Sequence, residues 1–167
     1  MAPSGGIQLQ VAVRVRPLTQ KEATRGAFAC LEVVDEGQTI QCMDPDDKQL
    51  ESLGGQKVTD YLRLDKTKDR TYTFDNAIAP AVSQTDTFEL TTSSLIPDVL
   101  SGRNACAFAY GATGSGKTFT MTGSESAPGL IPHTVDSLFQ SASGAAGDAF
   151  VVTMQYVEIY NEQISPG

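Results

Sequence analysis

One glycine-rich loop constrains this chain more than any other part of its sequence. Residues 111–118 read Gly-Ala-Thr-Gly-Ser-Gly-Lys-Thr, which matches the phosphate-binding pattern G-x-x-x-x-G-K-[ST]. The glycines allow the backbone to curl until successive N–H groups point at phosphate oxygens. An apolar run over residues 105–110 precedes the loop and predicts a buried strand, and a short helix is predicted from about Lys117. The sequence therefore predicts a strand–loop–helix unit that binds a nucleoside triphosphate.

Each type of residue in this loop has a physical task. Lys117 supplies a positive charge to the β- and γ-phosphates, and the Thr118 hydroxyl is a hard oxygen ligand suited to Mg²⁺. The structural alternative is a glycine-rich turn with an exposed lysine, but the predicted strand before the loop and helix after it favour phosphate binding. The candidate cofactors are ATP and Mg²⁺. The candidate contacts are Gly111, Ala112, Thr113, Gly114, Ser115, Gly116, Lys117 and Thr118, of which Thr118 is the metal ligand.

Phosphate binding does not by itself predict hydrolysis. A P-loop ATPase also needs a carboxylate for Mg²⁺ and a group that positions the attacking water. Glu158 lies near the end of a predicted strand, but the strand continues apolar beyond it, which favours a structural carboxylate. His133, the only histidine, has no companion and is read as an ordinary residue at a helix start. We therefore assign no catalytic residue.

Composition is typical of one globular domain. The chain has 167 residues, of which 40% are hydrophobic and 19% charged. No apolar run approaches the ~20 residues that span a membrane, and the N-terminus lacks a signal peptide. The three cysteines have no metal-ligand spacing. The net charge of −8 argues against nucleic acid as a partner. We expect a cytoplasmic protein with no membrane partner.

Alternating residues predict a strand near the N-terminus. Over residues 7–16 apolar side chains recur at every second position, which is typical of a strand with one buried face. Pro17 ends it, because proline has no N–H for the ladder. Residues 31–34 and 39–43 flank a turn and predict a hairpin. Further strands are predicted over residues 71–74, 105–110 (with Cys106 as a buried thiol) and 149–160.

Capping residues and prolines predict the helices. Ser83 is a good N-cap, Gly102 suits a helix end, and Pro97 predicts a kink or a new turn between them. Pro132 is placed to open a second helix. The apolar face of that second helix comprises Val135, Leu138 and Phe139. Residues 44–70 are charged and irregular, which predicts a surface loop or insertion.

Five sequence blocks, in order, resemble the kinesin motor domain. They are residues 11–18 with the R-x-R-P signature, residues 72–75 with the F-D motif, residues 108–121 around the loop, residues 129–132, and residues 156–162. Together they are far more specific than the loop alone. The resemblance implies an α/β fold, with a P-loop NTPase-type mixed sheet flanked by helices. It implies that residues 1–167 form an incomplete, N-terminal half of a kinesin motor domain, with a core over residues 7–167.

The resemblance also implies how the base of ATP is held. In kinesins the adenine lies against the arginine and proline of R-x-R-P and against the residue after the P-loop threonine. The matching residues in this sequence are Arg14, Pro17 and Phe119. The guanidinium and the aromatic ring both offer a flat face for stacking on a purine. Without the resemblance, Arg14 reads as a charge at a strand edge and Phe119 as a core aromatic.

The kinesin pattern extends beyond these residues. In kinesins, switch I and switch II (with the Walker-B aspartate) follow, together with most of the microtubule-binding surface. The acidic net charge agrees, because a surface that binds acidic microtubules should be basic. We therefore expect microtubules to bind through the C-terminal half, and this chain alone to lack hydrolysis. The strand before the loop would have unpaired edges, so we expect marginal stability.

Two functions stay open at this point. The first is the ATP-binding portion of a microtubule motor of the cytoskeleton, whose full-length form couples ATP hydrolysis to movement. The second is a truncated, non-motor module that binds nucleotide or a partner without ATPase activity. A third reading, a small-molecule kinase, would need substrate and lid arginines, and Arg103 is the last arginine in the chain. The sequence leaves the oligomeric state unknown.

Overall fold

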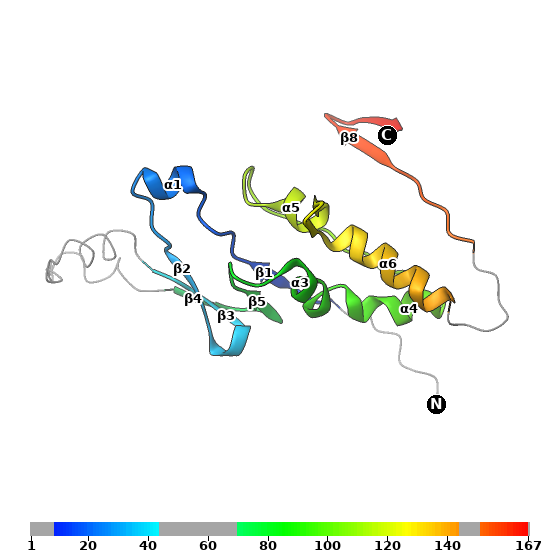
Figure 1. The fold of residues 1–167 in the computed structure, drawn as a ribbon, viewed down its shortest axis with the longest axis horizontal. Helices are drawn as coiled ribbons and strands as arrows, with labels where there is room; N and C mark the ends of the chain where they lie inside the picture. Colours follow the sequence, from blue (N-terminus) through cyan, green and yellow to red (C-terminus); the bar gives the residue numbers. More distant parts are fainter. Residues whose placement is uncertain (1–8, 44–69, 144–150, 167) are drawn as a thin grey trace, which may run out of the picture.

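The computed structural model describes residues 9–43, 70–143 and 151–166, in which helices and strands alternate along the chain (Figure 1). This mixture agrees with the predicted α/β class. Residues 44–69 of the predicted surface loop lie outside the described residues. The strands are β1 (Ala12–Arg14), β2 (Leu31–Val34), β3 (Thr39–Cys42), β4 (Arg70–Thr73), β5 (Asn76–Ile78), β6 (Gly123–Ser124), β7 (Ala127–Pro128), β8 (Val157–Tyr160) and β9 (Gln163–Pro166). The helices are α1 (Gln20–Thr24), α3 (Gln84–Leu90), α4 (Ile96–Leu100), α5 (Lys117–Met121) and α6 (Leu130–Ser143), with 3₁₀ turns η1 (Asp35–Gly37) and η2 (Ser93–Leu95).

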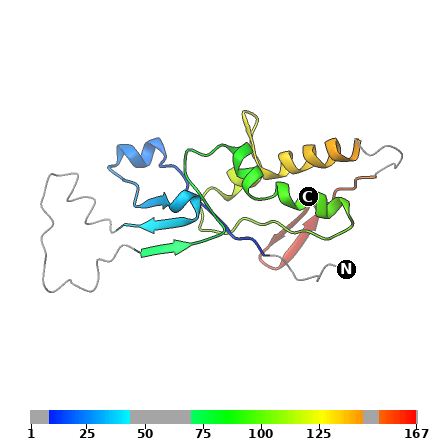
Figure 2. The same cartoon turned by 90° about the horizontal axis from the view of Figure 1, so that it is seen from below.

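Strands β2, β3 and β4 form an antiparallel sheet at one end of the elongated molecule (Figures 1 and 2). Strands β2 and β3 pair from Leu31 opposite Cys42 to Val34 opposite Thr39, which confirms the predicted hairpin. The turn between them has Asp35 and Glu36 at φ of 52° and 54°. Aspartate tolerates this left-handed region better than most residues, so Asp35 suits the turn, whereas Glu36 adopts the region at a cost.

Strand β1 is shorter than the sequence predicted. It pairs in parallel with β5 over three residues, with Val13 opposite Ala77, and the Val15 N–H donates to the Ile78 carbonyl at 2.9 Å. The prediction of a strand over residues 7–16 is wrong for residues 9–11 and 15–16, and its residues 7–8 lie outside the described residues. The Val11 N–H donates instead to the Asp75 carboxylate at 2.7 Å. A side chain therefore replaces a strand partner at this position, and the ladder begins one residue later.

Two small hydrophobic clusters hold the described elements together. The first packs β1 and β5 against the three-stranded sheet around Val15, Ile40 and Ala77. The second packs α3, α4 and α6 around Phe88, Ile96 and Leu130. Burial of such side chains contributes about 1.5–3 kcal/mol each. Few of the described residues are buried in either cluster, so both clusters are small.

Capping and proline chemistry set the helices as predicted. The Ser83 hydroxyl accepts from the Asp86 N–H at 3.0 Å, which confirms it as the N-cap of α3. Pro97 lies in the first turn of α4, where its missing N–H costs no intrahelical bond. It therefore starts a new helix rather than interrupting one. Gly102 follows α4 with φ of 88°, which a residue with a Cβ adopts at a cost.

Helix α6 begins two residues earlier than Pro132 and runs beside α3 and α4 (Figure 2). Leu130 and Leu138 pack into the helical cluster. The predicted apolar face is only partly correct, because Val135 is 41% exposed and Phe139 51% exposed. Helix α6 contacts α3, α4, α5 and β7 among the described elements, and these neighbours leave both side chains partly exposed. None of the helices in the described ranges combines the length and the apolar character that a membrane crossing requires.

The apolar run before the loop forms no strand, which overturns the prediction for residues 105–110. Phe108 is 78% exposed, Tyr110 is 95% exposed, and Cys106 is exposed rather than buried. Among the described residues, no strand pairs with this run. A strand exists through hydrogen bonds to a neighbour, so apolar composition alone does not produce one.

The long strand predicted over residues 149–160 is also wrong in extent. Only Val157–Tyr160 is a strand, and it forms the hairpin β8–β9. Residues 151–156 are exposed and have no regular structure. The hairpin is exposed as well and lies apart from the helices in Figure 1.

Candidate functional site

The loop at residues 111–118 has the backbone shape that its glycines allow. Gly114 and Gly116 have φ of 81° and 98°, and Gly116 is the N-cap of α5 in the left-handed region. L-residues other than glycine pay about 1–2 kcal/mol there. The predicted short helix from Lys117 is confirmed as α5. The Ser115 N–H donates to the Ala112 carbonyl at 3.1 Å, which closes the loop on itself.

Several donor groups of this loop have no acceptor among the described residues. In the described part of the chain, the N–H groups of Gly114, Gly116 and Lys117 donate to no carbonyl. The Thr118 hydroxyl likewise makes no hydrogen bond there. The Lys117 ammonium donates to the Gly111 and Ala112 carbonyls, at 2.8 and 2.9 Å. A ring of amide donors with one lysine fits the chemistry of phosphate oxygens, and the Thr118 oxygen fits a hard cation.

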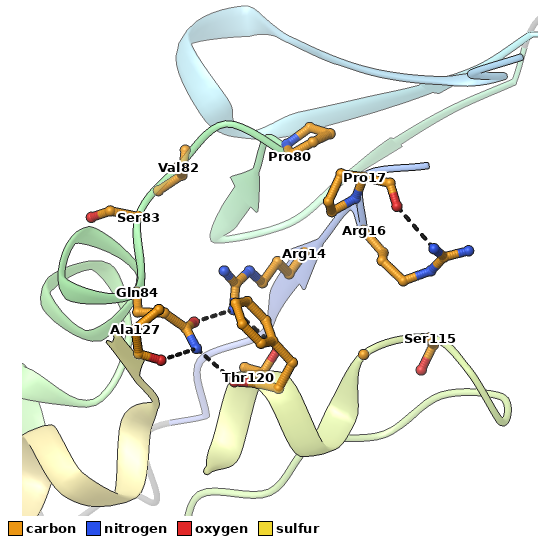
Figure 3. Close-up of a pocket in the computed structure, with 12 residues that line it drawn as sticks. Arg14, Arg16, Pro17, Pro80, Val82, Ser83, Gln84, Ser115, Thr120 and Ala127 are labelled. Atoms are coloured by element: carbon orange, nitrogen blue, oxygen red, sulfur yellow. Dashed lines mark hydrogen bonds between the residues drawn. The ribbon is translucent and has the colours of Figure 1, made fainter. Parts of the chain in front are cut away.

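A pocket of about 280 Å³ lies beside this loop (Figure 3). It joins the end of β1, the start of α3, the turn before α5 and β7. Its lining residues are Arg14, Arg16, Pro17, Pro80, Val82, Ser83, Gln84, Ser115, Gly116, Phe119, Thr120 and Ala127. Whole small-molecule sites usually measure about 300–1,000 Å³, so this pocket suits one part of a nucleotide.

Arg14 is the central side chain of the pocket. Its Nη1 donates to Gln84 Oε1 at 2.6 Å and to Thr120 Oγ1 at 3.1 Å. Its guanidinium carbon lies 5.4 Å from the centre of the Phe119 ring. Burial lowers the pKa of Arg14 from its usual value. The guanidinium remains charged at neutral pH, because the usual pKa of arginine lies far above neutrality, and it forms a cation–π contact with the ring.

Gln84 joins three elements of the pocket wall. It is 6% exposed and lies in the first turn of α3. Its amide nitrogen donates to the Phe119 carbonyl at 2.6 Å and, more weakly, to the Ala127 carbonyl at 3.4 Å. Figure 3 shows its side chain between Arg14 and Ala127, with dashed hydrogen bonds to both. The buried amide is therefore satisfied at both ends.

A capping box holds the outer edge of the pocket. The Glu22 carboxylate receives two bonds from Arg16, at 2.8 and 3.0 Å, and one from the Thr19 N–H at 2.8 Å. Thr19 is the N-cap of α1 and accepts from the Glu22 N–H. The hydrogen bonds from Arg16 and Thr19 lower the pKa of Glu22 to about 2. The same pairing raises the pKa of Arg16. Arg16 is thereby fixed beside Gly116, whose added Cβ would lie 3.7 Å from it.

The structure brings some of the sequence-derived candidates together and leaves others apart. Arg14, Pro17 and Phe119, although far apart in sequence, all line the pocket. Two loop residues, Ser115 and Gly116, line it as well. The other loop candidates form the neighbouring loop rather than the pocket wall; they are Gly111, Ala112, Thr113, Gly114, Lys117 and Thr118.

Sequence reasoning missed four polar residues of this pocket, namely Arg16, Gln84, Thr120 and Ser83, the last of which it predicted only as a helix cap. Arg16 belongs to the same R-x-R-P block as Arg14, and Thr120 lies one helical turn after Lys117. The sequence therefore contained a signal by which Arg16 and Thr120 could have been predicted as pocket residues. Gln84 follows an N-cap and resembles any polar residue in a first helical turn, so only its burial reveals it.

Neither of the remaining polar candidates lies in the pocket wall. Glu158 is exposed on β8, in the hairpin that lies apart from α5 (Figure 1). His133 lies in the first turn of α6 and stacks on Phe88, with ring centres 5.5 Å apart. Within the described ranges, no three His, Cys, Asp or Glu side chains gather as a metal site would require.

Comparison with known proteins gives one consistent result. Residues 14–166 match the family model described as the kinesin motor domain. The human kinesin-like protein KIF19 is 40% identical over 158 residues, which cover 94% of this chain and 15% of KIF19. The rice kinesin-like protein KIN-8A is 34% identical over 169 residues, covering 98% of this chain and 20% of KIN-8A. The human kinesin-like protein KIF18B is 38% identical over 157 residues, which cover 93% of this chain and 18% of KIF18B. This chain thus spans at most about a fifth of these relatives.

Proposed function

Because this chain belongs to the kinesin motor domain family, we propose that it carries the ATP site of a microtubule motor. ATP binds as its Mg²⁺ complex, with the phosphates on the loop at residues 111–118 and the base in the adjoining pocket. The fold that we propose for the domain is the P-loop NTPase-type α/β fold. The observation that carries this proposal is the contact between the two parts: Ser115 and Gly116 belong to the loop and also line the pocket.

The phosphates meet a loop in which three backbone N–H groups have no acceptor in the described part of the chain. The amides of Gly114, Gly116 and Lys117 offer N–H groups, and Lys117 carries the positive charge. The Lys117 ammonium now donates to two loop carbonyls, so phosphate oxygens replace neutral acceptors with charged ones. Hydrogen bonds to charged groups contribute more, about 1.5–3 kcal/mol. Mg²⁺ held by Thr118 and the phosphates neutralises phosphate charge when bound.

The base lies against a surface made by Arg14, Pro17 and Phe119. The guanidinium carbon lies 5.4 Å from the Phe119 ring centre. A base inserted between the two would need about 7 Å, twice the contact distance of stacked carbons. The purine therefore stacks on the combined face of the two side chains, and Pro17 covers it from the β1 side.

The whole protein, of which this chain is the nucleotide-binding portion, couples ATP hydrolysis to movement along microtubules in the cytoskeleton. This part of the proposal rests on family membership and on relatives named as kinesin-like proteins. Microtubules bind outside this chain, because its net charge of −8 is unfavourable for an acidic partner.

Equilibrium binding of a fluorescent ATP analogue to the 167-residue chain tests the proposal. Lys117→Ala should weaken binding about 10- to 100-fold, since it removes hydrogen bonds to a charged phosphate. Lys21→Ala removes an exposed lysine of α1 and serves as the control, with unchanged affinity. Equal affinities of the wild-type chain and Lys117→Ala would contradict the proposal.

A second candidate function is a nucleotide-binding module without ATPase activity. The pocket lining favours it for this chain, because its polar members are arginine, serine, glutamine and threonine and none is acidic. Hydrolysis needs a carboxylate for Mg²⁺ and a group that positions water. Microtubule-stimulated ATP turnover by the 167-residue chain, lost in Lys117→Ala, would exclude this alternative. ATP binding without turnover would support it.

A further inference from the structure

We propose that Gln84 is a positioning residue that holds the Arg14 guanidinium against Phe119, so that the two side chains form one stacking face for the base. This inference rests on the proposed ATP site and adds a residue that does not itself contact phosphate. The juxtaposition of Arg14, Gln84 and Phe119 in the pocket wall carries it; Figure 3 shows Arg14 and Gln84 facing each other.

Arg14 needs such support because it is long. An arginine side chain loses up to about 2 kcal/mol of rotamer entropy when it is held in one conformation. The bond from Nη1 to Gln84 Oε1, at 2.6 Å, is short and involves a charged donor, which makes it one of the stronger kinds. The bond to Thr120 Oγ1 is longer, at 3.1 Å. Gln84 is therefore the principal restraint on the guanidinium.

The other end of the same amide restrains Phe119. The Gln84 nitrogen donates to the Phe119 carbonyl at 2.6 Å, so one side chain bridges the cation and the backbone of the aromatic residue. Gln84 is 6% exposed, and its own rotamer is limited by packing in the first turn of α3. Because both polar ends of this buried amide are occupied, it fixes the positions of Arg14 and Phe119. It has no polar group free to hydrogen-bond the edge of the base.

The loop and the pocket should therefore contribute separately to the binding free energy of the nucleotide. The loop at residues 111–118 acts on the phosphates whether or not a base is present. Gln84 acts only through the base, because Arg14 and Phe119 lie in the pocket. Its loss should reduce the affinity for ATP and leave the affinity for a base-free triphosphate unchanged.

The test compares two ligands, Mg²⁺–ATP and Mg²⁺–inorganic tripolyphosphate, by calorimetry on the 167-residue chain. Gln84→Met replaces the amide with an apolar side chain of similar length. Affinity for ATP should fall about three- to tenfold, the range of a cation–π contact, while that for tripolyphosphate stays within about twofold. Glu89→Gln, an exposed change on the same helix, should alter neither. The ratio of the two affinities is the readout, because a smaller folded fraction lowers both equally.

A second variant separates positioning from packing. Gln84→Glu keeps the acceptor for Arg14 and loses the donor for Phe119, so it should recover most of the ATP preference that Gln84→Met loses. The proposal would be overturned if Gln84→Met left the ratio of the ATP and tripolyphosphate affinities unchanged, whether both affinities fell equally or neither fell. Failure of the proposed ATP site looks different: the wild-type chain would then bind neither ligand, or Lys117→Ala would bind tripolyphosphate as well as the wild type.

Discussion

Arg16 and Glu22 form a two-pronged ion pair beside the pocket, with Nη2–Oε1 at 2.8 Å and Nη1–Oε2 at 3.0 Å. The pair connects the R-x-R-P segment to the N-terminal cap of α1. It holds Arg16 near Gly116 of the loop. Although both side chains are partly exposed, the matched fork geometry favours the ionised form of Glu22.

The stabilising effect of this pair should depend on pH. The hydrogen bonds from Arg16 and Thr19 lower the pKa of Glu22 from its usual 4.5 to about 2 in the folded chain. The unfolded chain therefore binds a proton first as pH falls, and stability decreases. The contribution is fully present above about pH 4.5 and is lost as pH falls through about 2. Carbon-detected NMR of the Glu22 carboxyl should show a midpoint near 2.

A variant gives the matched control for this titration. Glu22→Gln should lower the melting temperature near neutral pH, and the difference from wild type should shrink towards pH 2. Glu89→Gln removes a carboxyl that forms no ion pair within the described ranges. Any difference in melting temperature between Glu89→Gln and wild type should therefore not shrink in this way towards pH 2. A Glu22 midpoint above 4 would contradict the assigned hydrogen bonds.

The Thr118 hydroxyl should govern the dependence of ATP binding on Mg²⁺. Thr118→Val keeps the branched shape and removes the oxygen ligand. The gain in ATP affinity on adding Mg²⁺, measured against EDTA, should fall about tenfold. Thr118→Ser keeps the hydroxyl and should retain the gain. An undiminished Mg²⁺ effect in Thr118→Val would remove Thr118 from the metal site.

Gly123 should tolerate alanine worse than any open glycine of similar backbone shape. Its φ is 74°, and an added Cβ would lie 2.2 Å from the Ala127 carbonyl oxygen and 2.4 Å from the Gly129 nitrogen. Backbone atoms at this distance must move, so Gly123→Ala should cost about 3 kcal/mol or more of unfolding free energy.

Gly102→Ala is the control that distinguishes steric crowding from backbone strain in the Gly123→Ala variant. The φ of Gly102 is 88°, and nothing lies within 4 Å of an added Cβ. Gly102→Ala therefore carries strain alone and should cost about 1–2 kcal/mol. Urea denaturation of both variants measures the difference. Equal costs would mean that the β6–β7 turn relaxes freely around a methyl group.

The 167-residue chain should be marginally stable in isolation. Its described hydrophobic clusters are small, while large apolar side chains such as Phe108, Tyr110 and Met154 are 78%, 95% and 86% exposed. Exposed apolar area contributes nothing to folding. We expect a thermal midpoint below ~60 °C and binding of a hydrophobic dye. A cooperative transition well above that temperature would contradict this expectation.

Local sequence chemistry predicted the elements that depend on neighbours in the chain. Ser83 caps α3 because its hydroxyl reaches an N–H three residues away. Pro97 opens α4 for an equally local reason. The hairpin of β2 and β3 needs only its own turn. Each of these interactions spans a few residues and leaves a direct trace in the sequence.

Predictions that depended on distant partners failed. Residues 105–110 have the composition of a buried strand but pair with no described strand and are exposed. The strand over residues 7–16 was shortened because the Asp75 carboxylate takes the Val11 N–H. Val135 and Phe139 lie on the predicted face of α6 yet are exposed. In each case the result depends on which distant group lies alongside.

By itself, the sequence determined the glycine-rich loop at residues 111–118, the caps that begin its helices and the family to which the chain belongs, since these depend on residue type and spacing over short ranges. Only the tertiary structure decided which side chains meet in the pocket. Arg14 reaches Phe119 and Gln84 because β1, α3 and α5 pack together. Contacts across 70 to 106 residues of chain follow from packing, and packing leaves no periodic pattern by which sequence alone could reveal them.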